Sequence, residues 1–296
     1  MEFRKISIVG GGSLGRSLAQ KVASCGIDAV VLEVSEERCA YAHEELVSTL
    51  DDELRKWGIT SSEKKAILGR ITLTTDAAAL ADGDLLVEAV TEDLALKQAV
   101  MRSMAERMPA DCVLVTSTST LSATEIAAAC GRADHVVGMH FMTPVTRSPV
   151  VEVVRATETS DASFARAVAF AQTLDKTVIE VFEYPGYVVT RAILPFVNEA
   201  MYIVMEGVAK AADVDLALRL GYDFKMGPLE YADRLGLDTM LGWMDHLFHE
   251  LGDFKYRPCP LLRQMVRAGR LGRKTGRGFF EYRGSERVRS EREAAR

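Results

Sequence analysis

A glycine-rich turn near the start of the chain constrains the fold most strongly. Residues 10–15 read Gly-Gly-Gly-Ser-Leu-Gly, between an apolar run at 6–9 and a helix-forming segment at 16–23. In a GxGxxG turn the first glycine allows a tight turn, the second lets the backbone approach a pyrophosphate, and the third lets helix and strand pack closely. The spacing therefore predicts a dinucleotide site formed by Gly10, Gly12, Ser13, Leu14 and Gly15.

The apolar pattern beyond this turn predicts an α/β fold. Short runs rich in valine and isoleucine alternate with longer segments of helical period, and lie at 6–9, 29–32, 85–90, 112–115 and 136–141. Continuous apolar strands that alternate with helices are typical of a parallel sheet buried on both faces. We expect a Rossmann-type, doubly wound sheet in an NAD-binding domain at residues 1–184.

Three further segments complete the expected organisation. Residues 36–70 predict an inserted αα-hairpin that turns at 56–58, and residues 150–181 predict two extra strands around a helix that begins near 161. Strand signals end at 184–186, where Tyr-Pro-Gly introduces a helical region. We therefore expect a smaller all-α domain for substrate binding and dimerisation at 185–282, and a charged tail at 283–296.

Composition excludes several classes of partner. The chain has 36 Lys and Arg against 42 Asp and Glu, a formal net charge of −6, which provides no basic footprint for nucleic acid. No apolar run approaches the roughly 18 residues of a membrane span. The five cysteines are scattered and lack metal-ligand spacing. We expect a cytoplasmic protein with free thiols, no metal, and neither nucleic acid nor membrane as a partner.

An acidic residue at the end of the second strand favours NAD. Glu33 stands eighteen residues after Gly15, where a carboxylate binds ribose hydroxyls. It would repel the 2′-phosphate of NADP, and residues 34–36 offer no arginine for that phosphate. NAD is therefore the expected cofactor.

Polar residues at strand ends indicate a reaction centre, because ligands of open α/β sheets lie beyond the carboxyl ends of the strands. Residues 117–120 follow one strand, His140 lies in another, and Glu152 stands among four valines. A carboxylate in that setting needs a partner, which a histidine can supply. Such a pair suits alcohol oxidation, with imidazole as the base. A satisfied core histidine is the alternative.

From residue 5 to 282 the chain resembles the 3-hydroxyacyl-CoA dehydrogenase family, in particular the bacterial 3-hydroxybutyryl-CoA dehydrogenases. Besides the glycine turn, the resemblance rests on VEAVTE at 87–92 with Lys97, GMHFMTPV at 138–145, VEV at 151–153, PGYVVTR at 185–191, MGPLE at 226–230 and LGRKTGRGF at 271–279. These motifs occur in order along nearly the whole chain.

The resemblance implies an NAD-dependent interconversion of a 3-hydroxyacyl thioester and its 3-oxoacyl form. It makes His140 the catalytic base, Glu152 its partner, Ser119 a contact of the substrate oxygen and the nicotinamide, and Thr190 a modified catalytic helper. It also implies that the helical domain forms a homodimer and closes the acyl cleft. The residues that it places around NAD, beyond the glycine turn and Glu33, are Glu92, Lys97, Ser119, Thr143 and Lys274.

The sequence departs from the family pattern at several positions. The family usually carries asparagine where this chain has Ser117, Thr143 and Thr190. Threonine offers one short hydroxyl in place of an amide that donates and accepts, so the helper at 190 is altered.

The inserted hairpin departs as well. Thr49, Lys56 and Ser119 are the expected substrate contacts, but residues 51–53 add three acids where the family binds the nucleotide of CoA. We expect these acids either to repel CoA or to face solvent.

Three functions remain open at this stage. The first is a dehydrogenase of a free CoA thioester. The second is a dehydrogenase of a hydroxyacyl group, such as a glyceryl thioester, on the phosphopantetheine arm of a carrier protein in polyketide extender-unit biosynthesis. The third is a catalytically weak NAD-binding protein with a structural or sensing role.

Overall fold

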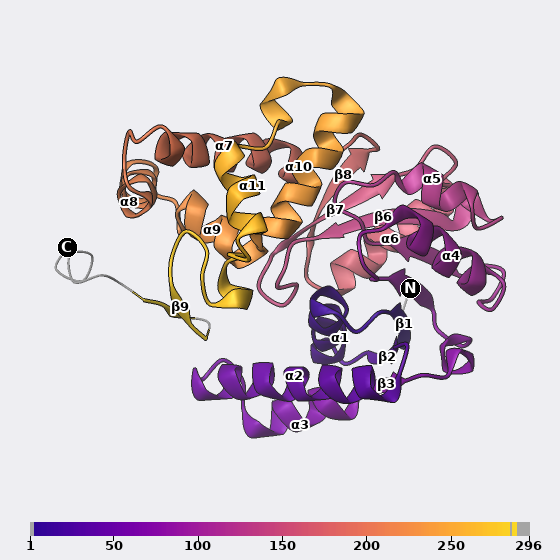
Figure 1. Cartoon of the computed structure of the whole chain (residues 1–296). Helices are drawn as coiled ribbons and strands as arrows, with labels where there is room; N and C mark the ends of the chain where they lie inside the picture. The colour runs from indigo at the N-terminus through magenta and orange to yellow at the C-terminus, as the bar shows by residue number, and fades with distance from the viewer. Residues whose placement is uncertain (1–2, 285, 289–296) are drawn as a thin grey trace. The chain divides into compact units, whose positions relative to one another are not determined.

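An eight-stranded sheet forms the centre of the first of two units, Met1–Tyr187 and Val188–Arg296 (Figure 1). The computed structural model describes residues 3–284 and 286–288. The strand order is β3-β2-β1-β4-β5-β6-β7-β8. The strands are β1 (Lys5–Val9), β2 (Asp28–Leu32), β3 (Ile71–Thr74), β4 (Leu85–Glu88), β5 (Val113–Thr116), β6 (Val136–Phe141), β7 (Val150–Arg155) and β8 (Thr177–Phe182).

The direction of the strands changes once across the sheet. Strands β3 to β6 pair in parallel, β7 runs antiparallel to β6, and β8 runs parallel to β7. The predicted doubly wound, Rossmann-type sheet is confirmed. The sequence reasoning missed β3, a four-residue edge strand that no continuous buried apolar run marks.

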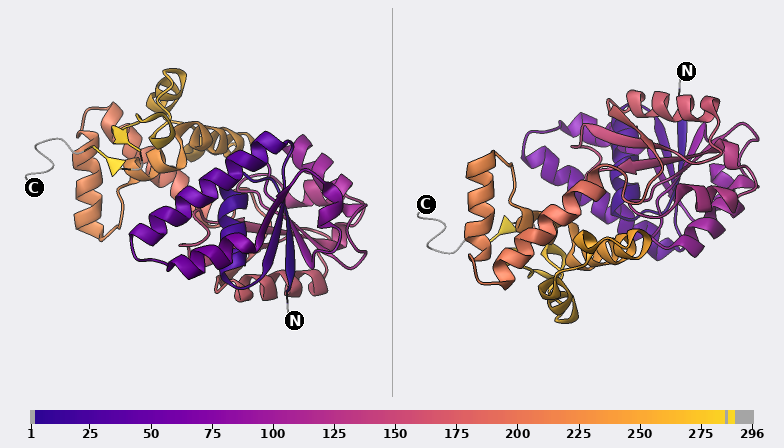
Figure 2. Two further views of the ribbon diagram at one scale, coloured as in Figure 1. Left: turned by 90° about the horizontal axis from the view of Figure 1, so that it is seen from below. Right: turned by 90° about the horizontal axis from the view of Figure 1, so that it is seen from above.

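Helices cover both faces of the sheet (Figure 2). Side chains of α1 (Ser13–Ser24) and α6 (Asp161–Thr173) fill one core, and those of α4 (Leu94–Ala105) and α5 (Ala123–Ala128) fill the other. In β4, Leu85 and Val87 face the first core and Leu86 the second. Successive strand residues point to opposite faces, so both must be apolar, which explains the continuous apolar runs.

The expected hairpin consists of α2 (Glu36–Arg55) and α3 (Ser61–Gly69). The hydroxyl of Ser35 accepts the N–H of Arg38 at the start of α2, and Thr60 and Glu63 form a reciprocal capping box at the start of α3. Both caps satisfy backbone donors that a helix leaves unpaired. The Ser35 cap sets the start of the hairpin, and the capping box sets the end of the turn between its two helices.

The second unit contains five helices among its described residues, and the predicted all-α character is confirmed. They are α7 (Val189–Met205), α8 (Ala211–Tyr222), α9 (Pro228–Leu235), α10 (Leu237–Leu251) and α11 (Pro260–Arg267). Their own apolar core includes Leu194, Met201, Leu229, Met240 and Met244. The short 3₁₀ segments of the chain are η1 (Ala77–Leu80), η2 (Ala133–His135), η3 (Phe254–Tyr256) and η4 (Arg273–Thr275).

The charged tail was expected to begin at residue 283, but regular structure continues to Arg287. Strands β9 (Tyr282–Arg283) and β10 (Glu286–Arg287) pair antiparallel. The guanidinium of Arg287 lies over the ring of Phe280, 3.5 Å from its centroid, and this cation–π contact holds the hairpin to the second unit. Residues 285 and 289–296 of the expected tail lie outside the described residues.

None of the helices in the described part of the chain is long and apolar enough to cross a bilayer.

Close backbone packing at the glycine turn predicts unequal effects of two similar substitutions. A Cβ at position 15 would lie 1.9 Å from the carbonyl oxygen of Gly10, whereas a Cβ at position 12 would meet no atom within 4 Å. We expect Gly15→Ala to lower the free energy of unfolding by about 3 kcal/mol or more, and Gly12→Ala by less than about 1 kcal/mol. Thermal unfolding followed by circular dichroism measures both; equal stability of the two variants would contradict this packing.

A buried carboxyl in the second unit predicts a pH-dependent stability. The oxygens of Asp215 accept the N–H groups of Leu229 and Glu230 at the start of α9, both at 2.9 Å. Burial raises the pKa of Asp215 from 3.8 to about 6, against the lowering effect of these hydrogen bonds. The folded state therefore binds more protons between pH 4 and 6 than the unfolded state, and this group's contribution to stability falls as the pH rises.

When the pH falls from 7 to 4.5, the free energy of unfolding of the protein with Asp215 should rise by about 2 kcal/mol more than that of Asp215→Asn. Urea unfolding of Trp57→Phe protein, in which Trp243 of α10 reports on the second unit, measures the difference. A difference that does not change with pH would show that burial leaves the pKa of Asp215 unaltered.

Candidate active site

The glycine turn provides room and donors for a phosphate group. Gly12 is the N-cap of α1, and no side chain caps this helix end, so its first N–H groups have no side-chain acceptor. The space next to Gly12 is open, as shown above. An anion at a helix N-terminus is stabilised by such N–H groups and by the helix dipole. The turn therefore fits the pyrophosphate of a dinucleotide, with Ser13 exposed and Leu14 half-buried beside it.

The carboxylate of Glu33 is held against this turn, directly after β2. Its two oxygens accept the N–H of Gly11 at 2.8 Å and the N–H of Val34 at 3.1 Å. Glu33 therefore lies beside the glycine turn, as its spacing from Gly15 predicts.

The sequence reasoning missed an arginine beside Glu33. The Nη2 of Arg38, in the first turn of α2, lies 3.8 Å from Oε1 of Glu33, and the Arg38 side chain is about half exposed. Arg38 lies only two residues beyond the segment 34–36, in which no arginine stands.

The antiparallel pairing of β6 with β7 places His140 directly opposite Glu152. The Nδ1 of His140 and Oε2 of Glu152 are 2.6 Å apart, and both side chains are buried, with Glu152 fully excluded from solvent. This distance is typical of a charge-assisted hydrogen bond. Because the carboxylate takes Nδ1, the ring's Nε2 is the nitrogen that can serve as a base.

An aromatic ring contacts the imidazole. The ring centroids of Tyr187 and His140 are 5.7 Å apart, and the Tyr187 hydroxyl donates to the carbonyl oxygen of Leu121 at 3.4 Å. Burial raises the pKa of Tyr187 well above its usual range, so its hydroxyl stays protonated. The sequence reasoning quoted Tyr187 within a motif but assigned it no role, since only the fold brings it to His140.

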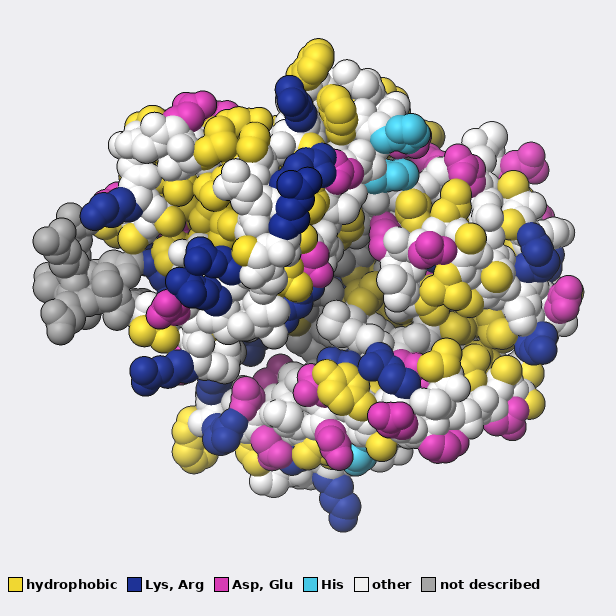
Figure 3. Space-filling model, in the orientation of Figure 1, with side chains coloured by type: hydrophobic (Ala, Val, Ile, Leu, Met, Phe, Trp, Pro, Cys, Tyr) yellow, Lys and Arg dark blue, Asp and Glu magenta, His cyan; other side chains and the backbone are white. Residues whose placement is uncertain are grey.

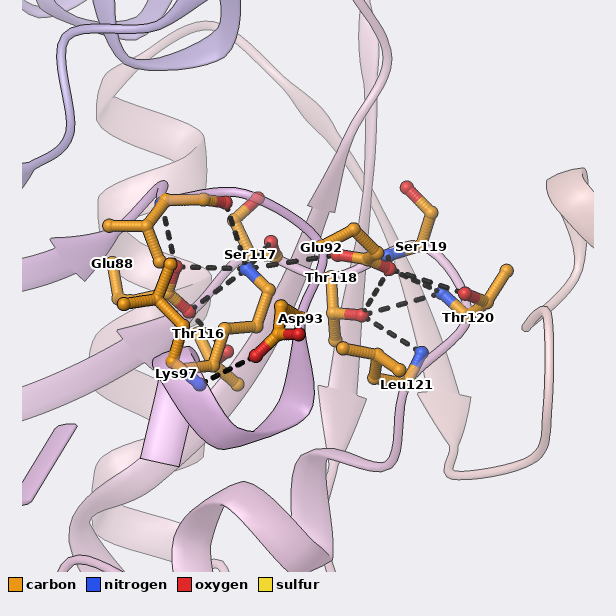
Figure 4. Close-up of polar contacts among 12 residues, drawn as sticks. Glu88, Glu92, Asp93, Lys97, Thr116, Ser117, Thr118, Ser119, Thr120 and Leu121 are labelled. Carbon is orange, nitrogen blue, oxygen red and sulfur yellow. Dashed lines mark hydrogen bonds and ion pairs between the residues drawn. The ribbon is translucent and has the colours of Figure 1, made fainter. Parts of the chain in front are cut away.

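The turn after β5 carries Ser119 and is held by Glu92 (Figure 4). Oε1 of Glu92 accepts the hydroxyl of Thr118 at 2.6 Å and the N–H groups of Ser119 and Thr120 at 2.8 and 3.0 Å. The hydroxyl of Ser119 points away from this carboxylate in Figure 4. Ser117 donates its hydroxyl to the carbonyl oxygen of Met139 at 3.0 Å, which ties the turn to the strand of His140.

Lys97 lies beneath this turn and has no exposed surface. Its Nζ is 2.9 Å from Oε1 of Glu88 and 2.9 Å from the carbonyl oxygen of Ser117, and 3.7 Å from Oε2 of Glu92. Burial raises the pKa of Glu88, which Lys97 opposes. Lys97 therefore lies beneath the residues expected to contact NAD, and it has no exposed surface with which to contact NAD itself.

Three other predicted site residues have surroundings of their own. Thr143 is exposed on the loop after β6, and this loop is tied to α1 by the N–H of Val145, which donates to Ser17 at 2.8 Å. Thr190 is buried at the start of α7, and Lys274 pairs with Asp238 at 2.6 Å. Both belong to the second unit, and their part in the site stays a prediction.

The three acids at 51–53 of the hairpin each have a partner within the chain. Asp51 pairs with Lys64 at 2.5 Å, Asp52 pairs with Arg55, and Glu53 accepts the amide of Gln20 at 2.9 Å. Acidic and basic side chains are interspersed over this part of the surface (Figure 3). Two of the three acids are thus paired with cations, which weakens the expected repulsion of CoA. The predicted substrate contacts Thr49 and Lys56 are exposed on the same hairpin.

Comparisons with known proteins agree with this geometry. Residues 5–184 match the family model described as 3-hydroxyacyl-CoA dehydrogenase, NAD binding domain, and residues 186–282 match that of the 3-hydroxyacyl-CoA dehydrogenase C-terminal domain. A probable 3-hydroxybutyryl-CoA dehydrogenase of Bacillus subtilis is 40% identical over 95% of this chain and 98% of its own. The 3-hydroxybutyryl-CoA dehydrogenase of Bradyrhizobium diazoefficiens is 38% identical over 97% and 98%.

Solved structures are similar over the same length. FadB2 of M. tuberculosis has a TM-score of 0.92 at 35% identity and covers 96% of this chain and 100% of its own. The (S)-3-hydroxybutyryl-CoA dehydrogenase PaaH1 of Ralstonia eutropha has a TM-score of 0.87 at 38% identity over 95% and 100%. The resemblance seen in the motifs is confirmed: the chain belongs to the 3-hydroxyacyl-CoA dehydrogenase family and is an NAD-dependent oxidoreductase.

Proposed function

We propose that this enzyme interconverts a short 3-hydroxyacyl-CoA, such as 3-hydroxybutyryl-CoA, and the corresponding 3-oxoacyl-CoA. The observation that carries the proposal is the buried His140–Glu152 pair, with Nδ1 and Oε2 2.6 Å apart. The names of relatives such as the 3-hydroxybutyryl-CoA dehydrogenase of Bradyrhizobium diazoefficiens support the choice of substrate.

In this proposal His140 moves the proton of the reaction. Its Nε2 takes the proton of the substrate 3-hydroxyl, while Glu152 keeps the ring oriented and stabilises the imidazolium that results. The hydroxyl of Ser119 donates a hydrogen bond to the same substrate oxygen. NAD, when bound, supplies the acceptor of the hydride that leaves the substrate carbon. In the opposite direction the imidazolium returns its proton to the oxygen of the 3-oxo group.

We assign cofactor binding to residues 1–184 and substrate closure and dimerisation to residues 185–282. The turn Gly10, Gly12, Ser13, Leu14 and Gly15 would hold the pyrophosphate and Glu33 the ribose hydroxyls, with Thr143 and Lys274 around the cofactor. The expected place of Glu92 near NAD would follow from its contacts with the turn that carries Ser119. Exposed apolar side chains of the second unit support a homodimer, because such surface favours burial against a second copy. They are Met205, Val208, Leu220, Tyr222 and Phe224.

A free CoA thioester is favoured over a carrier-bound group. The argument for a carrier protein rested on the missing asparagines and on the acids at 51–53; two of these acids pair with cations of the hairpin, and the third accepts the amide of Gln20. Thr49 and Lys56 would contact the CoA nucleotide, and Thr190 would assist at the thioester. The five cysteines are free thiols, which supports a reducing cytoplasm. A merely structural NAD-binding role is disfavoured because the catalytic pair is complete.

Oxidation of NADH with acetoacetyl-CoA, followed at 340 nm, tests the proposal. We expect turnover that His140→Asn lowers by at least about 100-fold, since the asparagine amide can still donate to Glu152 but has no proton that it can transfer to the 3-oxo oxygen. His249→Asn, an exposed position on α10, is the control. The same acetoacetyl group on a phosphopantetheinylated carrier protein is tested in parallel. Turnover of the carrier-bound group alone would favour the carrier alternative, and turnover of neither would favour the weak NAD-binding protein.

The ion pair of Glu33 with Arg38 predicts how the cofactor preference can be changed. The enzyme should prefer NADH strongly, because Glu33 repels a 2′-phosphate and holds Arg38. Glu33→Ser should raise kcat/KM for NADPH at least about tenfold, since Arg38 then becomes available to the phosphate.

Adding Arg38→Ala to Glu33→Ser should abolish this gain. Equal rates with NADH and NADPH for the unaltered enzyme would contradict the role given to Glu33.

A further inference from the structure

The backbone that presents Ser119 is held by a side chain from another loop of the first unit. Residues 117–122 follow β5 and precede α5 without regular secondary structure. The N–H groups of Ser119 and Thr120 donate instead to Glu92, which lies between β4 and α4. The position of the Ser119 hydroxyl therefore depends on where the Glu92 carboxylate is fixed.

One oxygen of Glu92 collects most of the donors of this turn. Its Oε1 accepts the Thr118 hydroxyl and the N–H groups of Ser119 and Thr120, and the Thr120 hydroxyl at 3.3 Å. The Thr118 hydroxyl in turn accepts the N–H of Leu121 at 2.9 Å. Both residues that flank Ser119 are thus bound to the same acceptor (Figure 4).

The charge beneath the turn is balanced without Glu92. Lys97 and Glu88 are both fully buried, and Nζ of Lys97 lies 2.9 and 3.1 Å from the two oxygens of Glu88. A buried ammonium needs a counter-charge, which Glu88 supplies. Glu88 is itself satisfied by the N–H of Val90 at 2.7 Å and the hydroxyl of Thr116 at 2.8 Å. Glu92, about one quarter exposed, stands 3.7 Å from Lys97 at the edge of this pair.

We propose that Glu92 is a positioning residue that acts through Ser119. It serves as a hydrogen-bond acceptor for the turn 118–120, at the edge of the Lys97–Glu88 pair. This inference rests on the proposed function, in which Ser119 contacts the substrate oxygen. It differs from a role in which the negative charge of Glu92 acts on the cofactor, because an acceptor oxygen of the same reach would suffice.

Two substitutions separate these roles. Glu92→Gln keeps an acceptor oxygen at the same distance and removes the charge, whereas Glu92→Ala removes both. We expect Glu92→Ala to lower kcat with acetoacetyl-CoA by about 10- to 100-fold, since a misplaced reacting group has an effect of this size. Its KM for NADH should stay within about threefold. Glu92→Gln should keep kcat within about threefold of the unaltered enzyme.

The control is Glu106→Ala, which removes an exposed carboxylate at the end of α4. Equal losses of kcat in Glu92→Gln and Glu92→Ala would overturn the proposal. So would a rise in KM for NADH in both variants with kcat unchanged, because either result would assign the effect to the charge.

Amide hydrogen exchange tests the same proposal without any substrate. The amides of Ser119 and Thr120 should exchange at least about tenfold faster in Glu92→Ala and at nearly the original rate in Glu92→Gln, because an amide exchanges when its hydrogen bond opens. Unchanged exchange in Glu92→Ala would overturn the proposal. If the unaltered enzyme turns over no acyl thioester, the proposed function fails, and the exchange rates still decide whether Glu92 holds the turn.

Discussion

The contact between His140 and Glu152 is the constraint on which the site depends. Glu152 is fully buried among valines of β7, and a carboxylate in such surroundings needs a partner that compensates for lost hydration. The antiparallel register supplies it, because it sets Glu152 directly opposite His140. This requirement constrains the register of β6 and β7, because a shift by one residue would turn the carboxylate to the other face.

A second buried ionic pair maintains the neighbouring strand ends. Lys97 and Glu88 bring together the end of β4, the start of α4 and the carbonyl oxygen of Ser117 after β5. Breaking such a pair leaves an uncompensated charge in the interior, so it resists local rearrangement. The hydroxyl of Ser117 extends the connection to Met139, the residue before His140. The turn of Ser119 and the catalytic pair therefore share one rigid sheet edge, as a reaction centre requires.

Much of this arrangement could be predicted from local patterns. Gly10, Gly12 and Gly15 are specified by backbone geometry within a few residues, so the turn, its strand and its helix were found from spacing alone. The hairpin of α2 and α3 was found because its helical period and its turn at 56–58 are local too. The edge strand β3 was missed, since four partly exposed residues form a strand only because β2 lies beside them. Arg38 was missed because its guanidinium folds back one helical turn to Glu33.

The sequence by itself determined the class of fold, the site of the cofactor turn and the residue types of the catalytic pair, because these depend on periodicity, short spacing and the chemistry of side chains. Only the tertiary structure decided which groups meet. The direction of β7, the placement of Tyr187 against His140, and the contact of Gln20 with Glu53 depend on segments far apart in the chain. Contacts of this kind form when the whole sheet packs, and no single segment encodes them.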